Sequence, residues 1–319
     1  MKKLLSLLLA LTLPCAALAE RYNDVAKHYL NTYGKWWDYS QELWLEYAAA
    51  TRASDPGSSN AARAIAATEY ILPPEGALSC EEAAAIAISA ANPAAQARPL
   101  MPCFMLDDRA VYKVILYVPG ESSSAYDTVE MDAMTGEVLD VYPFLTVDAG
   151  YLFVPNRAWV AASLQYSPEE LAQMSWSQLF DAYLARYGHW KDWNSVRWSE
   201  FVTAVREVDV SMSRTGRAVA ATEYISPAHE MLLEEDARDL AVAAMSEEAY
   251  VDNLVICFQA EGRAMFKVTV HTENMVYSAE LDAHTGEILG IYPQTSEGVG
   301  QFLVPHTVWE ATPETAPNG

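Results

Sequence analysis

Apolar side chains recur at two different spacings along this chain, and the first spacing is that of a helix. After Ser40, a plausible N-cap, apolar residues fall at Trp44, Tyr47 and Ala48. Positions i, i+3 and i+4 lie on one face of an α-helix, so this segment is predicted to form a helix whose stripe faces the core.

Two further helical segments are predicted before the spacing changes. A short helix or turn is expected over 64–70, and a proline pair ends it. Ser79 is followed three residues later by Glu82, which is a capping-box pattern. It predicts the start of an Ala-rich helix over 79–91, which an Asn-Pro pair stops.

From residue 103 onward the apolar positions alternate with a period of two, which is typical of strands. Such runs occupy 103–106, 111–118 and 126–131, and Asp-Asp and Pro-Gly turn signals separate them. A helix followed by an antiparallel meander predicts an α+β unit, with the helix packed on a small sheet.

The same sequence pattern occurs twice along the chain. YGKWWDYSQELWLEYAAATR at 33–52 matches YGHWKDWNSVRWSEFVTAVR at 187–206, and AATEYI also occurs in both halves. Self-similarity of this kind indicates a tandem duplication. We therefore predict a first repeat over 20–164 and a second repeat over 165–319.

The second repeat is expected to form the same elements as the first. Its helical stripe is Trp198, Phe201 and Val202, and its Ala-containing helix falls at about 234–245. Its strands are predicted at 255–258, 264–270 and 275–281.

The N-terminal residues have the pattern of a secretory signal peptide over 1–19. A basic start is followed by an apolar run over 4–13 and by small residues. Pro14 precedes Cys15 where a lipoprotein signal has a small residue, so we expect no lipid anchor there. No other stretch approaches 18 apolar residues, so we expect no stable membrane insertion and a secreted or cell-surface-associated protein.

The charge of the chain narrows the range of partners. It has 43 Asp and Glu against 20 Lys and Arg, for a formal net charge of −23. Nucleic acid is therefore excluded as an expected partner, because its phosphates repel such a surface. Half of the residues are apolar, so the charge is interpreted as a solubilising coat on a globular protein.

The motif Asp-Ala-x-Thr-Gly-Glu occurs once in each repeat and is interpreted as a structural turn. The Asp accepts backbone N–H bonds, and the Gly supplies a positive φ. The turn residues are Asp132, Thr135 and Gly136, with Asp282, Thr285 and Gly286. An aspartic-protease pair would need Asp directly before Thr-Gly, but Met134 and His284 stand there.

Other catalytic and metal-binding patterns are missing from the sequence. H-E-x-x-H, G-x-S-x-G and Gly-rich phosphate loops do not occur. His189 and His284 are matched in the first repeat by Lys35 and Met134, which a duplicated metal site would not allow. We expect no catalytic residues, no metal and no bound cofactor.

Three cysteines follow the signal peptide. Cys103 and Cys257 occupy matched positions at the start of apolar segments, which predicts buried, inert thiols. A disulfide between Cys80 and Cys103 stays open as an alternative.

An aromatic block precedes the first long helix of each repeat. Exposed Trp and Tyr side chains would form a binding surface, whereas buried ones would belong to the core. Both interpretations stay open for Trp36, Trp37, Tyr39, Trp190 and Trp193. Trp37 is matched by Lys191 and is the freest to be exposed.

Three segments in order, SCEEAAAIAISAA, AVYKVILYV and VEMDAMTGEVLDV, resemble the PepSY domain. The second repeat is similar, and the resemblance covers about 79–142 and 234–292. It implies a noncatalytic module that binds or restrains peptidases, or acts in protein contacts at the cell surface. It brings no catalytic residues.

These features together predict a secreted, noncatalytic protein that binds an extracytoplasmic protein or peptide, such as a peptidase. A cell-wall or glycan-binding module and a hydrolase with an unrecognised site are the alternatives. Polar residues shared by both repeats distinguish the hydrolase from the binding protein, since convergence with a His or Cys would favour an enzyme. They are Asp38, Glu46, Arg52 and Glu69, with Asp192, Glu200, Arg206 and Glu223.

Overall fold

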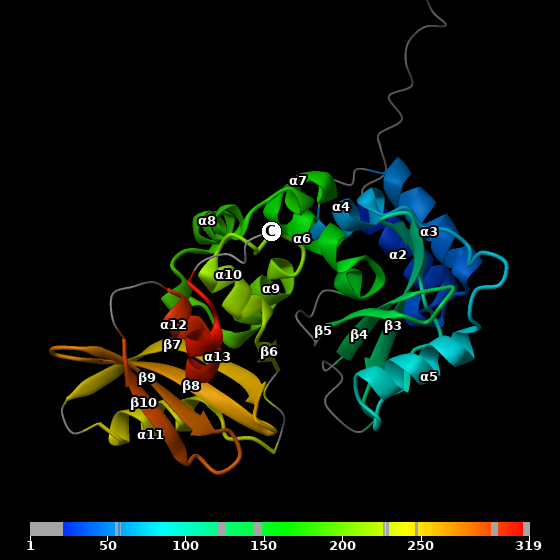
Figure 1. The fold of residues 1–319 in the computed structure, drawn as a ribbon. Coiled ribbons are helices and arrows are strands. Elements are labelled where there is room, and N and C mark those ends of the chain that lie inside the picture. The colour runs from blue at the N-terminus through cyan, green and yellow to red at the C-terminus, as the bar shows by residue number, and fades with distance from the viewer. Residues whose placement is uncertain are drawn as a thin grey trace, which may run out of the picture.

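Two antiparallel sheets, one in each half of the chain, organise the fold, and helices cover them (Figure 1). The computed structural model describes residues 22–54, 57, 59–119, 126–142, 149–225, 227, 230–245, 248–294 and 299–314. The predicted signal peptide and Cys15 lie outside these residues. The combination of helices and antiparallel strands confirms the α+β class.

The first half begins with helices that lead to the sheet. They are α2 (Tyr22–Tyr33), the 3₁₀ helix η1 (Trp36–Asp38), α3 (Gln41–Ala53), α4 (Asn60–Ala67) and α5 (Cys80–Ala90). The Ser40 hydroxyl caps α3 by accepting the Leu43 N–H at 3.2 Å. Trp44, Tyr47 and Ala48 are buried, so the predicted stripe is confirmed.

The start of α5 confirms the predicted capping box. The Ser79 hydroxyl accepts the Glu82 N–H, and the Glu82 carboxylate accepts the Ser79 N–H at 2.9 Å. Two of the four free N–H groups at this helix end are thereby satisfied.

The prediction of a helix or turn over 64–70 was wrong at both ends. Ser59 starts α4 earlier, because its hydroxyl accepts the Ala62 N–H at 3.0 Å. Tyr70 lies beyond the helix and forms a β-bridge with Phe104. Tertiary pairing therefore ends this helix before the proline pair is reached.

The first sheet is centred on β3. Its strands are β1 (Gln96–Ala97), β2 (Cys103–Leu106), β3 (Arg109–Tyr117), β4 (Tyr126–Asp132) and β5 (Val138–Tyr142). β3 pairs with β1, β2 and β4, and β4 pairs with β5, always antiparallel. β2, β3 and β4 confirm the predicted meander. β5 was not predicted as a strand, and it forms an edge of the sheet.

The second half has a similar order of elements. Its helices are α8 (Trp176–Tyr187), η4 (Trp190–Asp192), α9 (Ser195–Val205), α10 (Arg214–Ala220) and α11 (Glu234–Ala243). Its strands are β6 (Glu223–Tyr224), β7 (Ala249–Ala260), β8 (Arg263–Thr272), β9 (Val276–Asp282) and β10 (Ile288–Pro293). It differs from the first half in that β6 precedes α11 and one long strand, β7, replaces β1 and β2. The order across this sheet is β10-β9-β8-β7-β6, so β6 and β10 are its edges.

Each sheet is covered on both faces, because alternate side chains of its strands enter different cores. Tyr112, Val114 and Leu116 of β3 pack with α5. Val111 and Ile115 pack instead with the Trp- and Tyr-rich helices. The sequence had predicted a helix on one face only.

Four short helical segments follow the sheets and were not predicted. They are η3 (Ala149–Phe153) and α6 (Asn156–Leu164) after the first sheet, and α12 (Gly300–Leu303) and α13 (His306–Ala311) after the second. Trp159 of α6 joins the helical core of the first half, whereas Val160 and Leu164 join that of the second. α6 therefore binds the two halves together, and α7 (Pro168–Ala172) follows it.

Membrane insertion finds no support among the helices that the structure describes. None of these helices has the length and apolar character that crossing a bilayer requires.

Candidate functional site: the cleft between the repeats

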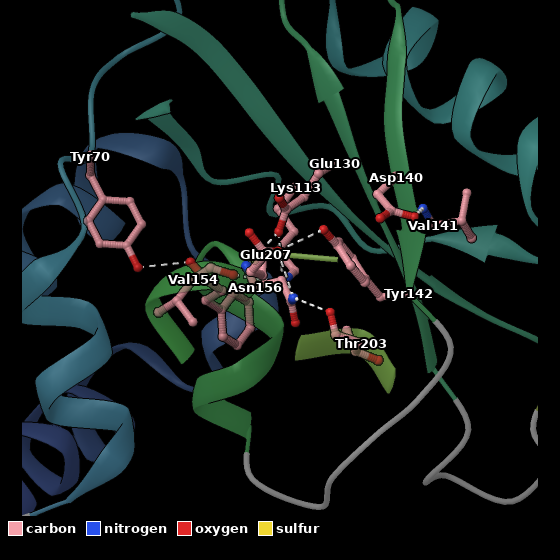
Figure 2. A network of polar contacts seen from close by, with 11 residues as sticks. Tyr70, Lys113, Glu130, Asp140, Val141, Tyr142, Val154, Asn156, Thr203 and Glu207 are labelled. Carbon is pink, nitrogen blue, oxygen red and sulfur yellow. Dashed lines mark hydrogen bonds and ion pairs between the residues drawn. The ribbon is translucent and has the colours of Figure 1, made fainter. Parts of the chain in front are cut away.

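A buried ion pair fastens the segment before α6 to the first sheet (Figure 2). Lys113 Nζ lies 3.3 Å from Glu130 Oε1, and the two side chains are 0% and 4% exposed. Lys113 also donates to the Val154 carbonyl at 2.7 Å, and Glu130 accepts the Asn156 N–H at 2.8 Å. Burial lowers the pKa of Lys113 and raises the pKa of Glu130.

The second repeat contains a matching buried Lys–Glu ion pair with the same two kinds of backbone contact. Lys267 Nζ lies 3.1 Å from Glu280 Oε1 and donates to the Val304 carbonyl at 2.5 Å. Glu280 accepts the His306 N–H at 2.6 Å. Sequence reasoning missed both pairs, although Lys and Glu at matched positions inside apolar strands were the available signal.

The Asp-Ala-x-Thr-Gly-Glu motif forms the same turn twice. Asp132 Oδ1 accepts the N–H groups of Met134 and Thr135, both at 2.9 Å. Gly136 has a φ of 75°, and an added Cβ would lie 2.7 Å from Ile86 Cδ1. The turn therefore requires glycine for both its conformation and its packing against α5.

The corresponding turn in the second repeat uses Asp282 in the same way. Asp282 Oδ1 accepts the N–H groups of His284 and Thr285 at 3.0 and 2.9 Å. Gly286 has a φ of 73° and lies against Leu240 of α11. These hydrogen bonds lower the pKa of both Asp132 and Asp282.

Three of the five aromatic residues considered for a binding surface lie in the core. Tyr39, Trp190 and Trp193 are only 3%, 5% and 3% exposed, which contradicts an exposed aromatic face at these positions. η1 and η4 turn the rings inward, where Trp193 packs on Phe201 with centroids 5.4 Å apart.

Trp36 and Trp37 are half-buried. The Trp36 ring contacts Tyr47 and Phe153, at centroid distances of 6.0 and 6.1 Å. Trp37 lies beside Arg98, whose guanidinium carbon is 5.1 Å from the ring centroid. Only these two rings retain exposed area for a partner.

Among the described residues, the side-chain contacts of the shared residues Arg52, Glu200 and Arg206 involve no His or Cys. Arg52 donates to the Ala66 and Thr68 carbonyls within its own repeat. Glu200 pairs with Arg197, but burial prevails and raises the pKa of Glu200 to about 7. The other shared carboxylates are Asp38, Glu46 and Glu69 in the first repeat, and Asp192 and Glu223 in the second.

Arg206 departs from this pattern because it crosses to the other repeat. It donates to the Asp140 carboxylate and, at 2.9 Å, to the Val141 carbonyl of β5. The Asp140 carboxylate also accepts the Val141 N–H at 2.8 Å. Both backbone groups of Val141 therefore point away from β4, toward the second repeat.

Glu207 forms the centre of the contact between the repeats (Figure 2). Its carboxylate accepts from Asn156 Nδ2 at 2.8 Å, Arg157 Nε at 3.1 Å and the Tyr142 hydroxyl at 3.3 Å. The Glu207 side chain is 8% exposed. This carboxylate of the second repeat is thus satisfied by side chains from the first.

A cleft of about 810 Å³ opens beside this contact. One wall is edge strand β5, from Val138 to Val141, and another is edge strand β6 with Ile225. The charged lining residues are Asp127, Asp140, Arg206 and Glu223. Edges of both sheets therefore border one acidic cleft.

Two of the three described cysteines are buried, as the sequence predicted. Cys103 and Cys257 are buried, and burial raises their pKa values to about 11 and about 12. Cys80 is exposed, and the structure has neither it nor Cys103 in a disulfide.

Within the described ranges, no group of three or more His, Cys, Asp or Glu side chains is arranged to hold a metal ion. The buried carboxylates bind Lys, Arg or backbone N–H groups instead. Their hydrogen bonds stabilise the fold and the contact between the repeats.

Comparisons with known proteins add little to this geometry. No family model matches the chain, and no curated protein matches it. Among solved structures it is similar to a "putative lipoprotein" from Clostridium difficile 630, with 11% identity and a TM-score of 0.20. The match covers 71% of this chain and 99% of that chain. A score this low indicates neither fold nor function.

Proposed function

We propose that this is a noncatalytic binding protein that holds an extended, positively charged segment of another extracytoplasmic protein in the cleft between its repeats. The observation that carries the proposal is that edge strands β5 and β6 border the same cleft. An edge strand has unpaired N–H and C=O groups, and an extended peptide can bind by adding a strand to it.

The charge of the cleft favours a basic segment. Asp127, Asp140 and Glu223 line it, and Arg206 is the cation among the described lining residues. Arg206 is already paired with Asp140. The chain as a whole carries a formal charge of −23, so a basic partner is attracted before contact as well as within the cleft.

The backbone of Val141 is the point at which an incoming strand would pair. Its carbonyl accepts from Arg206, and its N–H is bonded to Asp140. These side chains occupy the edge when no partner is present, which protects it from unspecific pairing. A bound segment takes their place at Val141 and leaves Arg206 free to pair with a partner carboxylate or with Glu223.

A peptidase is the partner that the sequence suggests. The resemblance of 79–142 and 234–292 to the PepSY domain supports a module that restrains peptidases. The predicted signal peptide over 1–19 supports a secreted or cell-surface-associated location for this contact.

The proposal is tested with ten-residue fluorescent peptides of alternating Lys-Val, Glu-Val and Gly-Ser sequence, titrated by anisotropy. We expect binding of the Lys-Val peptide only. Val141→Pro should weaken it about tenfold or more, because proline removes the outward N–H while the bonds to β4 remain.

The matched control is Ile291→Pro in edge strand β10, which occupies the corresponding position opposite Ala279. It should leave binding unchanged. Equal affinity for all three peptides, or equal loss in the two proline variants, would contradict the proposal. Circular dichroism and thermal unfolding verify that both variants are folded.

A further inference from the structure

Tyr250 of β7 presents an aromatic ring to solvent on the second repeat. It is 65% exposed, whereas His271, directly opposite on β8, is 8% exposed. The two rings are stacked, with centroids 4.7 Å apart and planes inclined by 7°. One face of the tyrosine is therefore covered by the histidine, and the other is open.

A series of contacts fixes this ring in place. His271 Nε2 lies 2.8 Å from Asp252 Oδ1. Asp252 Oδ2 lies 3.7 Å from Lys191 Nζ of η4. The histidine cannot turn without breaking a contact that is largely shielded from solvent, so the Tyr250 platform is preorganised.

Two hollows lie beside the platform. The larger, of about 670 Å³, includes Asn274, Gln294 and Phe302 in its lining. The smaller, of about 390 Å³, includes Glu248, and Tyr250, Thr272 and Glu273 border both hollows. The open aromatic ring thus has amide, hydroxyl and carboxylate groups near it, together with the apolar side chains of Met275, Val276 and Phe302.

Gln294 lines the larger hollow and has one unsatisfied hydrogen-bond acceptor. Its Nε2 donates to Ser278 Oγ at 2.6 Å, while its Oε1 is buried and has no hydrogen-bond partner among the described residues. A buried carbonyl oxygen without a donor costs free energy, so a ligand hydroxyl group that reaches this oxygen on binding would gain a hydrogen bond.

We propose that this surface binds a neutral oligosaccharide, with one pyranose ring on Tyr250 and its neighbours over the two hollows. A pyranose has an apolar C–H face that packs on an aromatic ring and equatorial hydroxyls that reach planar amides and carboxylates around it. Glu248 and Glu273 accept hydroxyl hydrogen bonds but repel anionic sugars.

The first repeat lacks such a platform at the matched positions. Gln96 and Tyr117 pair across β1 and β3 as Tyr250 and His271 do in the second. The Tyr117 hydroxyl donates to Gln96 Oε1 at 2.9 Å, and the Arg98 guanidinium carbon lies 3.9 Å from the Tyr117 ring centroid. The protein's own side chains cover this ring, so one sugar site is expected per chain.

The experiment is a titration of the full chain with cellotriose, chitotriose and trigalacturonate, followed by saturation-transfer NMR and calorimetry. At least one neutral trisaccharide should bind with a millimolar or better dissociation constant, and trigalacturonate should not. Tyr250→Ala should weaken binding about tenfold, and Tyr250→Phe should retain it.

The matched control is Tyr33→Ala, which removes another exposed tyrosine, 49% exposed, from the first repeat. It should leave affinity unchanged, as should Val141→Pro, which separates this site from the peptide cleft. Failure of both neutral trisaccharides to bind, tighter binding of trigalacturonate, or an unchanged affinity in Tyr250→Ala would overturn the proposal.

Discussion

The two repeats agree in their interiors and differ at their surfaces. Lys113 and Lys267 make the same buried contacts to a glutamate and to a backbone carbonyl. At matched positions of the two sheets, in contrast, Tyr117 lies under Arg98, whereas His271 lies under the exposed Tyr250. The backbone pairing is the same in both places, so it constrains the strands without fixing the chemistry of their outer side chains.

The contact between the repeats differs in the same way. Asn156 and Tyr142 of the first repeat bind Glu207. Their counterparts are His306 and Tyr292, whose rings stack on each other with centroids 3.8 Å apart. The matched side chains therefore bind the neighbouring repeat in the first repeat, whereas in the second repeat they contact each other.

The largest effect is expected from removing a buried lysine. Lys113→Met leaves Glu130 without its cation, which should lower the free energy of unfolding by about 3 to 5 kcal/mol. Lys267→Met should cost less, because Glu207 also repels Glu130 in the first repeat. Urea denaturation of both variants measures the difference. A smaller loss of unfolding free energy in Lys113→Met than in Lys267→Met would contradict this expected difference between the repeats.

A smaller effect is expected at the contact between the repeats. Glu207→Ala removes a buried carboxylate that accepts hydrogen bonds from the Asn156 amide and the Arg157 guanidinium, which should cost about 2 kcal/mol. Ala53→Glu adds a carboxylate at the matched, exposed position of the first repeat and should change stability by less than about 0.5 kcal/mol. Thermal unfolding compares the two. An equal loss of stability in the two variants would mean that a change of charge, and not the loss of the contact between the repeats, determines the effect.

The smallest effect is expected at the turns and should be alike in the two repeats. Asp132→Ala and Asp282→Ala each remove hydrogen bonds to two backbone N–H groups and should cost about 1 kcal/mol at pH 7. The folded state lowers the pKa of both carboxyls. Their contribution is thus present above the unfolded pKa of about 4 and is lost as the pH falls below it.

Urea denaturation of these turn variants at pH 7 and at pH 3 measures this dependence. The difference between each variant and the parent protein should shrink at the lower pH. A cost that is unchanged by pH, or that appears in one repeat only, would assign these aspartates different roles.

Local sequence rules predicted the elements that local contacts determine. The stripe of α3, the Ser79 capping box and strands β2 to β4 depend on residues close together in the chain, and they are found as predicted. β5 was missed because a register irregularity between Glu130 and Met131 interrupts its pairing, so no clean alternation marks it.

The features that escaped prediction depend on distant residues. Lys113 reads as an outward polar position in a strand, yet its partner Val154 lies 41 residues later. The aromatic residues could not be assigned to surface or core, because the burial of Trp193 depends on Phe201 in the next helix. The cleft likewise needs both sheets in place, and a single repeat gives no sign of it.

The Lys–Glu pairs also bear on the order in which each repeat folds while the chain is synthesised from its N-terminus. The first sheet can form once β5 is available, but Lys113 and Glu130 have no backbone partners until Val154 and Asn156 arrive. Until then, burying these two charged side chains under the aromatic helices would cost free energy. We therefore expect each repeat to complete its core only after its last segment has been synthesised.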